Sequence, residues 1–412
     1  MGKTKVLAIG DTADNIFTLK KFVKNVDIHL INFPRKQNAL LTYSEEGVEF
    51  FDSLLISKQV KMIKEICTKF DLCLAMSWAG ARVAYLAGLN YIMYFVGGDI
   101  ATPPFLKKSR DPFTNTIVYD LNFIERSFYK RVFDTALTCI GGQIEYNYLI
   151  KYRKDAIRLD RVIVDTTLFN HEIKPVNLKK EKFTFLSAQR FGLAKGFDII
   201  LEALRLCKTD FKVLQVKWFI ENSEEEKRIN RELIDKCPKQ VEFIPLIKRK
   251  ELGSYFTFAD AILGQMRIGA QGAIERDAAF CKKPVICFTD QNKPMIIDGK
   301  EVVPPFLPKT QDSHDLANLI DSIVQSKEFR DKLVEEQYSY IKKLSDPDEV
   351  VKEWERIFEA MTRKNKTIKR KSKTIIFENL LAVLSERLIY LRKMRMRNIK
   401  SWGKEEYERL TK

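Results

Sequence analysis

The chain has 412 residues, of which 45% are apolar and 31% are charged. At roughly 150 residues per domain, this length suggests two or three domains. The composition is rich enough for packed cores, which excludes wholesale disorder and collagen-like or low-complexity classes. Lysine and arginine number 71 against 55 aspartates and glutamates, so the formal net charge is +16. A bias of this size indicates a polyanionic partner: a nucleic acid, an anionic lipid surface or a phosphorylated substrate.

Cysteine and histidine are distributed in a way that argues against a metal site. The seven cysteines are scattered without a C-x-x-C pair, and the histidines are His29, His171 and His314. This spacing fits neither a thiolate nor a histidine zinc site, and it fits a reducing compartment. The longest apolar stretch, residues 83–96, falls short of the ~18 residues needed to span a bilayer. The N-terminus becomes a strand too early for a signal peptide. We therefore expect a cytoplasmic protein without a metal or other cofactor.

Short apolar runs alternate with helical patterns through the first half of the chain. Runs that predict buried strands lie at residues 6–9, 28–31, 72–76, 91–96 and 137–140. Continuous apolar strands with helices between them are typical of a parallel sheet that is covered on both faces.

The same pattern then restarts after a segment, residues 160–180, that has no long apolar period and is interpreted as a linker. Strands are predicted at residues 183–186, 213–216, 241–244, 261–263 and 285–288. Between the first two, residues 197–204 place apolar side chains on one helical stripe. We predict an α/β chain with two Rossmann-like, doubly wound domains facing across a cleft. Their ranges are 1–165 and 166–345.

A helical extension is predicted after these domains. Residues 346–362 are predicted to form one amphipathic helix. Residues 363–412 form a basic amphipathic extension, with seven cationic side chains between Arg363 and Lys373. This extension suits an anionic membrane surface, where each lysine or arginine contributes about 1 kcal/mol. The alternative is a helix docked on its own protein or on a partner subunit. Nucleic acid is a weaker third option because no recognition motif is present.

The loop after residues 183–186 holds the first candidate site. Ligands of open α/β sheets bind beyond the carboxyl ends of the strands. Arg190 and Lys195 lie five residues apart there, and Gly196 opens the following helix. Two cations and a helix N-terminus would surround a diphosphate and neutralise a leaving group without a metal. The alternative is a pair of solvated charges in a lysine-rich protein.

The second candidate is the glycine-containing loop that follows residues 261–263. Gly269 and Gly272 would let backbone N–H groups approach a sugar or a phosphate. Glu275 or Asp277 would accept ribose hydroxyls. The alternative is an ordinary strand-to-helix turn with surface acids.

Together these segments resemble the retaining, nucleotide-sugar-dependent glycosyltransferases of the GT-B fold, a likeness that covers most of residues 5–360. The first motif that carries it is R-x4-K-G at Arg190, Lys195 and Gly196, and the second is an apolar pair followed by a turn and a phenylalanine at residues 162–169. A third consists of Glu251-Leu252 together with Tyr255 and Ala259-Asp260. The others are residues 277–286, which end in Pro284-Val285-Ile286, the pair Asp298-Gly299, and the pair Leu316-Ala317. The resemblance implies that Arg190 and Lys195 hold the diphosphate of a nucleotide-diphosphate sugar, which is a substrate and not a cofactor. Asp277 or Glu275 would hold the ribose. Gly269 and Gly272 would contact the donor sugar and phosphate.

Several residues depart from the family pattern. Where the family has two glutamates eight apart, this chain has Gly269 and Asp277. Val96 stands where the family has a histidine near the reacting centre. A glycine turn after the second strand of the C-terminal domain is replaced by residues 217–219. These departures predict either a reshaped donor site or a catalytically inactive scaffold.

Two glycine loops are expected on the acceptor side. Gly10, Asp11 and Thr12 follow the first strand, and Gly97, Gly98 and Asp99 follow the fourth. Asp99 is a candidate catalytic residue that would hydrogen-bond a sugar or acceptor hydroxyl. The alternative for both loops is turn chemistry, and neither is a G-x-G-x-x-G fingerprint.

The resemblance therefore implies a metal-independent, retaining hexosyltransferase whose helix at residues 346–362 crosses back to the first domain. The basic extension at residues 363–412 is the basis for expecting a saccharide or lipid-linked acceptor and a protein that is either cytoplasmic or peripheral at the inner face of the membrane. The alternatives are an inactive scaffold and a nucleotide-sugar epimerase. The scarcity of histidine speaks against the epimerase.

Overall fold

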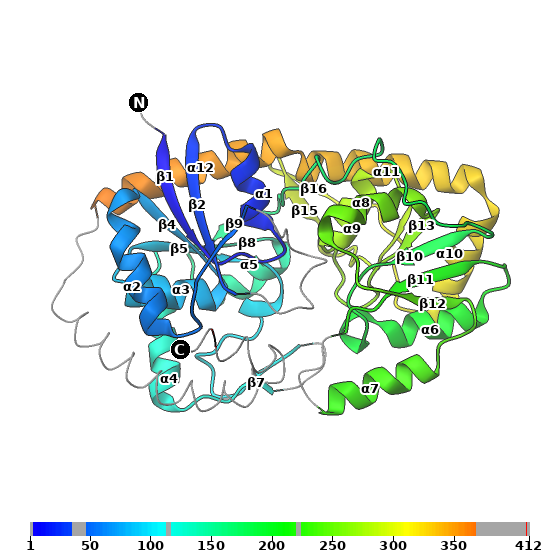
Figure 1. The fold of residues 1–412 in the computed structure, drawn as a ribbon, viewed down its shortest axis with the longest axis horizontal. Coiled ribbons are helices and arrows are strands. Elements are labelled where there is room, and N and C mark those ends of the chain that lie inside the picture. The colour runs from blue at the N-terminus through cyan, green and yellow to red at the C-terminus, as the bar shows by residue number, and fades with distance from the viewer. Residues whose placement is uncertain (1–2, 35–46, 113–116, 220–223, 368–408, 410–412) are drawn as a thin grey trace. The chain divides into compact units, whose positions relative to one another are not determined.

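The computed structural model describes residues 3–34, 47–112, 117–219, 224–367 and 409. Its contacts divide the chain into two compact units, which Figure 1 shows in chain-order colours. Among the described residues, the N-terminal unit comprises 3–34, 47–112, 117–162, 348–367 and 409. The C-terminal unit comprises 163–219 and 224–347.

The N-terminal unit is built on a seven-stranded sheet with the order β3-β2-β1-β4-β5-β8-β9, in which the neighbouring strands are parallel. The strands are β1 (Thr4–Ile9), β2 (Val26–Asn32), β3 (Glu49–Phe50), β4 (Leu72–Met76), β5 (Tyr91–Phe95), β8 (Thr138–Gly141) and β9 (Ile157–Arg158). The helices are α1 (Asn15–Phe22), α2 (Ile56–Ile66), α3 (Ser77–Leu86), α4 (Phe123–Asp134), α5 (Gln143–Leu149) and α12 (Pro347–Thr367). A small antiparallel ribbon pairs β6 (Ser109–Arg110) with β7 (Ile117–Tyr119).

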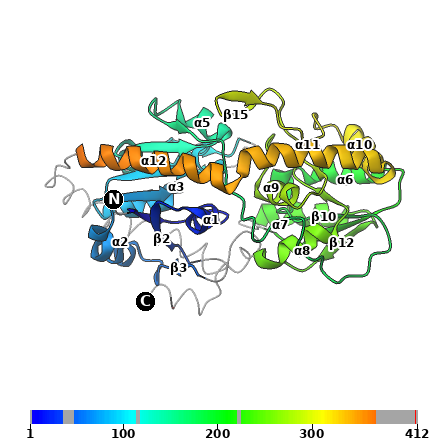
Figure 2. The same cartoon turned by 90° about the horizontal axis from the view of Figure 1, so that it is seen from above.

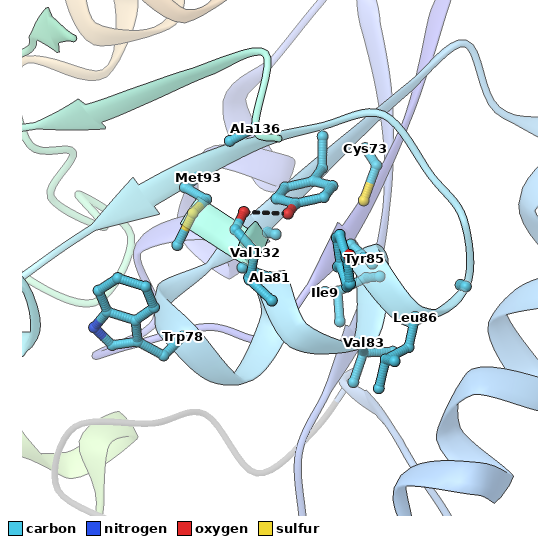
Figure 3. Close-up of a cluster of buried hydrophobic side chains, with 14 of the residues drawn as sticks. Ile9, Cys73, Trp78, Ala81, Val83, Tyr85, Leu86, Met93, Val132 and Ala136 are labelled. Carbon is cyan, nitrogen blue, oxygen red and sulfur yellow. Dashed lines mark hydrogen bonds between the residues drawn. The ribbon is translucent and has the colours of Figure 1, made fainter. Parts of the chain in front are cut away.

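Side chains of these strands alternate between two apolar layers. Met93 packs into one layer with residues of α2, α3 and α4. Figure 3 shows part of this cluster, including Trp78 of α3, and the dashed line is the bond that the Tyr91 hydroxyl donates to the Val132 carbonyl. The next residue along β5, Tyr94, meets Trp354 of α12 with ring centroids 4.9 Å apart. Figure 2 shows α12 running along this unit.

The C-terminal unit has a five-stranded sheet with the order β12-β11-β10-β13-β14, again with parallel neighbours. The strands are β10 (Thr184–Ser187), β11 (Lys212–Val216), β12 (Val241–Ile244), β13 (Ala261–Leu263) and β14 (Val285–Ile286). The helices are α6 (Phe197–Leu206), α7 (Glu224–Asp235), α8 (Arg249–Phe258), α9 (Ala273–Phe280), α10 (Ser313–Gln325) and α11 (Lys327–Ser345). An antiparallel hairpin joins β15 (Met295–Ile297) to β16 (Lys300–Val302).

Alternation along these strands supplies a core on each face of the second sheet. Phe185 and Val213 pack with residues of α6 and α10. Leu186 and Leu214, their neighbours in sequence, pack with residues of α8, α9 and α11. Both faces of the sheet are therefore covered by helices.

The predicted α/β class with two Rossmann-like units is confirmed, and each of the ten predicted strands is present. The sequence did not reveal the two-residue strands β3 and β9 or the two antiparallel hairpins. Helix α12 continues to Thr367, five residues past the expected end of the crossing helix. Most of the predicted basic extension, residues 368–408 and 410–412, lies outside the described residues. Among the helices that the structure describes, none is long and apolar enough to span a bilayer.

Candidate functional site

The loop between β10 and α6 presents Arg190 and Lys195. A 3₁₀ turn, η4 (Leu193–Lys195), ends at Gly196, which has φ 78°. A Cβ added to Gly196 would lie 2.9 Å from the Cβ of Met266, so both the dihedral and the close approach require glycine. The Met266 amide donates to the carbonyl of Lys195 at 2.9 Å. The loop is thereby fixed to the turn that follows β13.

Arg190 and Lys195 are brought together at this point. Both are half-buried. Desolvation is the largest cause that lowers the pKa of Lys195, and the charge of Arg190 lowers it further. The charge of Glu275 acts in the opposite direction. Three charged groups with a net positive balance therefore meet beside the N-terminus of α6, an arrangement suited to binding an anion.

Gln265 organises the turn after β13. It is fully buried, and its amide donates to the Ala270 carbonyl at 2.6 Å. Its side-chain oxygen accepts from the backbone N–H groups of Arg267 and Ile268 at 2.9 and 2.6 Å. Gly269 has φ 81°, and an added Cβ would lie 3.2 Å from the Cβ of Asp290. A glutamate like that of the family pattern would be strained in this backbone conformation.

Glu275 joins that turn to the start of α9. Its side chain is buried, and Oε1 accepts from the Gln265 backbone N–H at 3.0 Å. Oε2 accepts from the N–H of Gly272, the residue before α9, at 2.8 Å. Glu275 therefore shapes the glycine loop and also lies close enough to Lys195 to influence its pKa.

Asp277 has a different partner. Its carboxylate pairs with Arg249 of α8 at 3.3 Å, and both side chains are 4% exposed. Burial raises the pKa of Asp277 to about 6, against the lowering effect of Arg249 and then Arg276. The sequence left Glu275 and Asp277 as alternatives for one role, and the structure gives them different partners. The charge of Glu275 influences Lys195, whereas Asp277 forms an ion pair with Arg249.

The Gly10–Thr12 loop holds the start of α1. Gly10 has φ 81° and donates to the Ile31 carbonyl at 2.9 Å. The buried Asp11 carboxylate accepts from the N–H groups of Ile16 and Phe17 at 3.0 and 2.9 Å. Burial, followed by the charge of Asp14, raises the pKa of Asp11 to about 7. The Asp11 carboxylate satisfies backbone donors in the first turn of α1, which have no partner within the helix.

The turn after β5 is open on one side. A Cβ added to Gly97 or Gly98 would meet no atom within 4 Å in the described part of the chain. The N–H of Gly97, which has φ 87°, donates to Oε1 of Glu145 at 2.7 Å. Burial raises the pKa of Asp99, while a hydrogen bond from Ser77 opposes that rise.

Ser77 and Gln265 were not singled out by the sequence. Ser77 directly follows the predicted strand 72–76, so the rule that strand ends carry function could have found it. Gln265 lies in the indicated loop after residues 261–263, but its importance comes from side-chain hydrogen bonds within that loop and to the distant Phe288 carbonyl, which the sequence does not reveal. In the described ranges, no group of three or more His, Cys, Asp or Glu side chains is placed to hold a metal ion.

Comparisons with known proteins agree with this architecture. Residues 169–340 match the family model of the glycosyl transferases group 1. Anabaena HepE, solved in complex with UDP and glucose, is similar at a TM-score of 0.64 and 14% identity, covering 87% of this chain and 100% of that one. Sucrose-phosphate synthase from Thermosynechococcus elongatus gives 0.64 and 15%, covering 88% and 100%.

A putative UDP-N-acetylglucosamine 2-epimerase from Listeria monocytogenes is also similar, at a TM-score of 0.51 and 11% identity, covering 90% of this chain and 98% of that one. At these identities the likeness shows the fold alone. A search of curated protein sequences finds no match. The family match shows a glycosyl transferases group 1 region over residues 169–340, which includes the loop of Arg190 and Lys195, and the two Rossmann-like units have the architecture of the GT-B fold.

Proposed function

We propose that this glycosyltransferase moves a sugar from a nucleotide-diphosphate sugar to a saccharide or lipid-linked acceptor, without a metal ion and with retention of configuration. The bond between the sugar C1 and the β-phosphate oxygen breaks, and a bond from C1 to the acceptor oxygen forms. The proton of the acceptor hydroxyl leaves with the nucleoside diphosphate. The observation that carries the proposal is the meeting of Arg190 and Lys195 at the β10–α6 loop.

The two cations would bind the diphosphate and stabilise the negative charge that develops on it. Fixed donors in a partly desolvated site are worth more than the same groups in water. The lowered pKa of Lys195 indicates that its surroundings disfavour the ammonium when no anion is bound. A bound diphosphate would supply the missing negative charge and favour the protonated form.

The glycine loop would complete the donor site. Gly269 and Gly272 add no side chains to this loop, although the Gly272 N–H is already bonded to Glu275, and the Met266 amide joins the loop to Lys195, next to Gly196. Glu275 holds the loop in shape through its bonds to Gln265 and Gly272. Either Glu275 or Asp277 would receive the ribose hydroxyls. A uridine nucleotide is the first donor to test, because the similar Anabaena HepE was solved with UDP and with UDP-glucose.

The acceptor would bind to the N-terminal unit. The candidates are the Gly10–Thr12 loop and the turn of Gly97, Gly98 and Asp99. Because the Asp11 carboxylate already accepts two backbone N–H groups, Asp99 is the stronger candidate for contact with a hydroxyl. It would accept a hydrogen bond from the hydroxyl that attacks C1.

The experiment compares Arg190→Ala and Lys195→Ala with the wild type. Nucleotide-diphosphate sugars are first screened by thermal shift, because a ligand selective for the native state raises its melting temperature. Sugar transfer and nucleotide release are then measured with the donor that binds. Each variant should lower turnover at least tenfold with the fold intact. Lys332→Ala, which removes an exposed lysine of α11, is the matched control.

Three other results would contradict the proposal. Wild-type rates in both variants would remove the diphosphate assignment. Donor binding without transfer or nucleotide release would indicate the inactive scaffold. Conversion of the donor sugar to an epimer without an acceptor would indicate the epimerase.

A further inference from the structure

Ser77 has an unusual backbone conformation at the carboxyl end of β4. Its φ is 59°, a left-handed value that L residues other than glycine, asparagine and aspartate rarely adopt. Such a conformation costs free energy and persists only where the surroundings enforce it. Here α3 begins at Ser77 and packs closely against β1. A Cβ added to Gly80 would lie 2.2 Å from the Ile9 carbonyl oxygen.

This conformation directs the hydroxyl of Ser77 at Asp99. Ser77 Oγ donates to Oδ2 of Asp99. The next residue, Trp78, donates from Nε1 to the main-chain carbonyl of Asp99 at 3.0 Å. Strands β4 and β5 are parallel neighbours, so their carboxyl ends lie at the same edge of the sheet. Two consecutive residues of α3 therefore hold both the side chain and the backbone of the turn that follows β5.

The space beside Asp99 is accessible. Gly97 and Gly98 are exposed, and Asp99 is half-buried. No atom of the described chain lies within 4 Å of a Cβ added to either glycine. The glycine turn therefore leaves room for a ligand next to Asp99. The left-handed backbone of Ser77, the hydrogen bonds from Ser77 and Trp78 to Asp99, and the open glycine turn are separate observations. All of them lie at the carboxyl ends of β4 and β5.

We propose that Ser77 is a positioning residue of the acceptor site: its hydroxyl orients the Asp99 carboxylate, which accepts a hydrogen bond from the attacking hydroxyl of an acceptor sugar. This inference rests on the proposed glycosyl transfer. Burial disfavours the ionised Asp99, and a donor on the charged form offsets that effect. Glu145 of α5 is also titratable and lies at this turn, where its carboxylate accepts from the Gly97 N–H.

The test uses Ser77→Gly in the full chain. Glycine adopts the left-handed conformation without strain but has no hydroxyl. We expect a melting temperature at least as high as that of the wild type. We also expect kcat/KM for the acceptor to fall at least tenfold and the acid limb of its pH profile to move to higher pH. The thermal shift produced by the donor should not change. Ser77→Ala should show the same loss of transfer, and Ala79→Ser, at an exposed neighbour on α3, should behave as wild type.

A Ser77→Gly variant that is stable and transfers sugar at the wild-type rate with an unshifted pH profile would overturn the inference. Carbon-13 NMR of the Asp99 carboxyl gives a readout that needs no turnover. It should titrate at higher pH in Ser77→Gly, and an unchanged titration also overturns the inference. A wild-type protein that binds donor but transfers nothing would instead refute the proposed function, whatever Ser77→Gly does to Asp99.

Discussion

Replacement of Arg249 by methionine is expected to destabilise the C-terminal unit in a pH-dependent way. Arg249 and Asp277 are both 4% exposed and lie 3.3 Å apart. At an effective dielectric constant of about 20, unit charges at this separation attract by about 5 kcal/mol. Removing one partner of a buried pair typically costs about 3–5 kcal/mol because the other charge is left without compensation. The guanidinium of Arg249 also lies over the ring of Phe169, 4.9 Å from its centroid, and methionine replaces this cation–π contact with an apolar one.

The pH dependence follows from the pKa of Asp277. Its rise from 3.8 to about 6 means that the folded protein holds this proton more tightly than the unfolded chain. The contribution of Asp277 to the free energy of unfolding therefore falls by about 3 kcal/mol as pH rises from about 4 to 6. Without Arg249 the pKa rises further, so the decline continues above pH 6. We expect Arg249→Met to cost about 1 kcal/mol at pH 5 and about 3–5 kcal/mol at pH 8.

Urea unfolding followed by circular dichroism measures these costs, and hydrogen exchange locates them in the C-terminal unit. Lys250→Met, at an exposed site one residue along α8, should stay within about 0.5 kcal/mol of wild type. The double variant Arg249→Met/Asp277→Leu should recover stability to within about 1 kcal/mol. An equal cost of Arg249→Met at pH 5 and pH 8 would refute the reasoning. A folded double variant that binds donor normally would assign the ribose contact to Glu275.

Three further predictions concern the N-terminal unit. Trp354→Ala should cost about 3–5 kcal/mol in urea unfolding, because this side chain is 2% exposed against Tyr94 and Phe358; a cost below about 1 kcal/mol would contradict the packing of α12. Gly80→Ala should cost about 1–3 kcal/mol because α3 must move away from Ile9, and an unchanged melting temperature would count against it. Deleting residues 368–412 keeps the hydrogen bonds that Lys364 and Asn365 make to the N-terminal unit. If the deleted segment faces lipid, the truncated protein should no longer sediment with anionic liposomes. Unchanged sedimentation would remove the claim that this segment binds a membrane.

The sequence determined the architecture because apolar runs and their lengths are local properties. Buried parallel strands contain near-continuous apolar runs, so β1, β4, β5, β10 and β13 were visible without knowledge of their neighbours. The carboxyl-end rule then indicated the loops of Arg190 and Gly97. Strands β3 and β9 were not found, since each consists of one apolar and one charged residue outside any apolar run, whereas the two-residue edge strand β14 lies in the apolar run 285–288.

The tertiary structure decided which charged groups meet. Glu275 and Asp277 are two residues apart on one helix, and spacing alone assigned both to the same ligand. Their partners, Lys195 and Arg249, come from different loops and helices, so only folding could separate the two roles. The pairing of Ser77 with Asp99 has the same origin. A hydrogen bond between the ends of neighbouring parallel strands joins residues that are distant in sequence, and the strain that aims it exists only once both strands are packed.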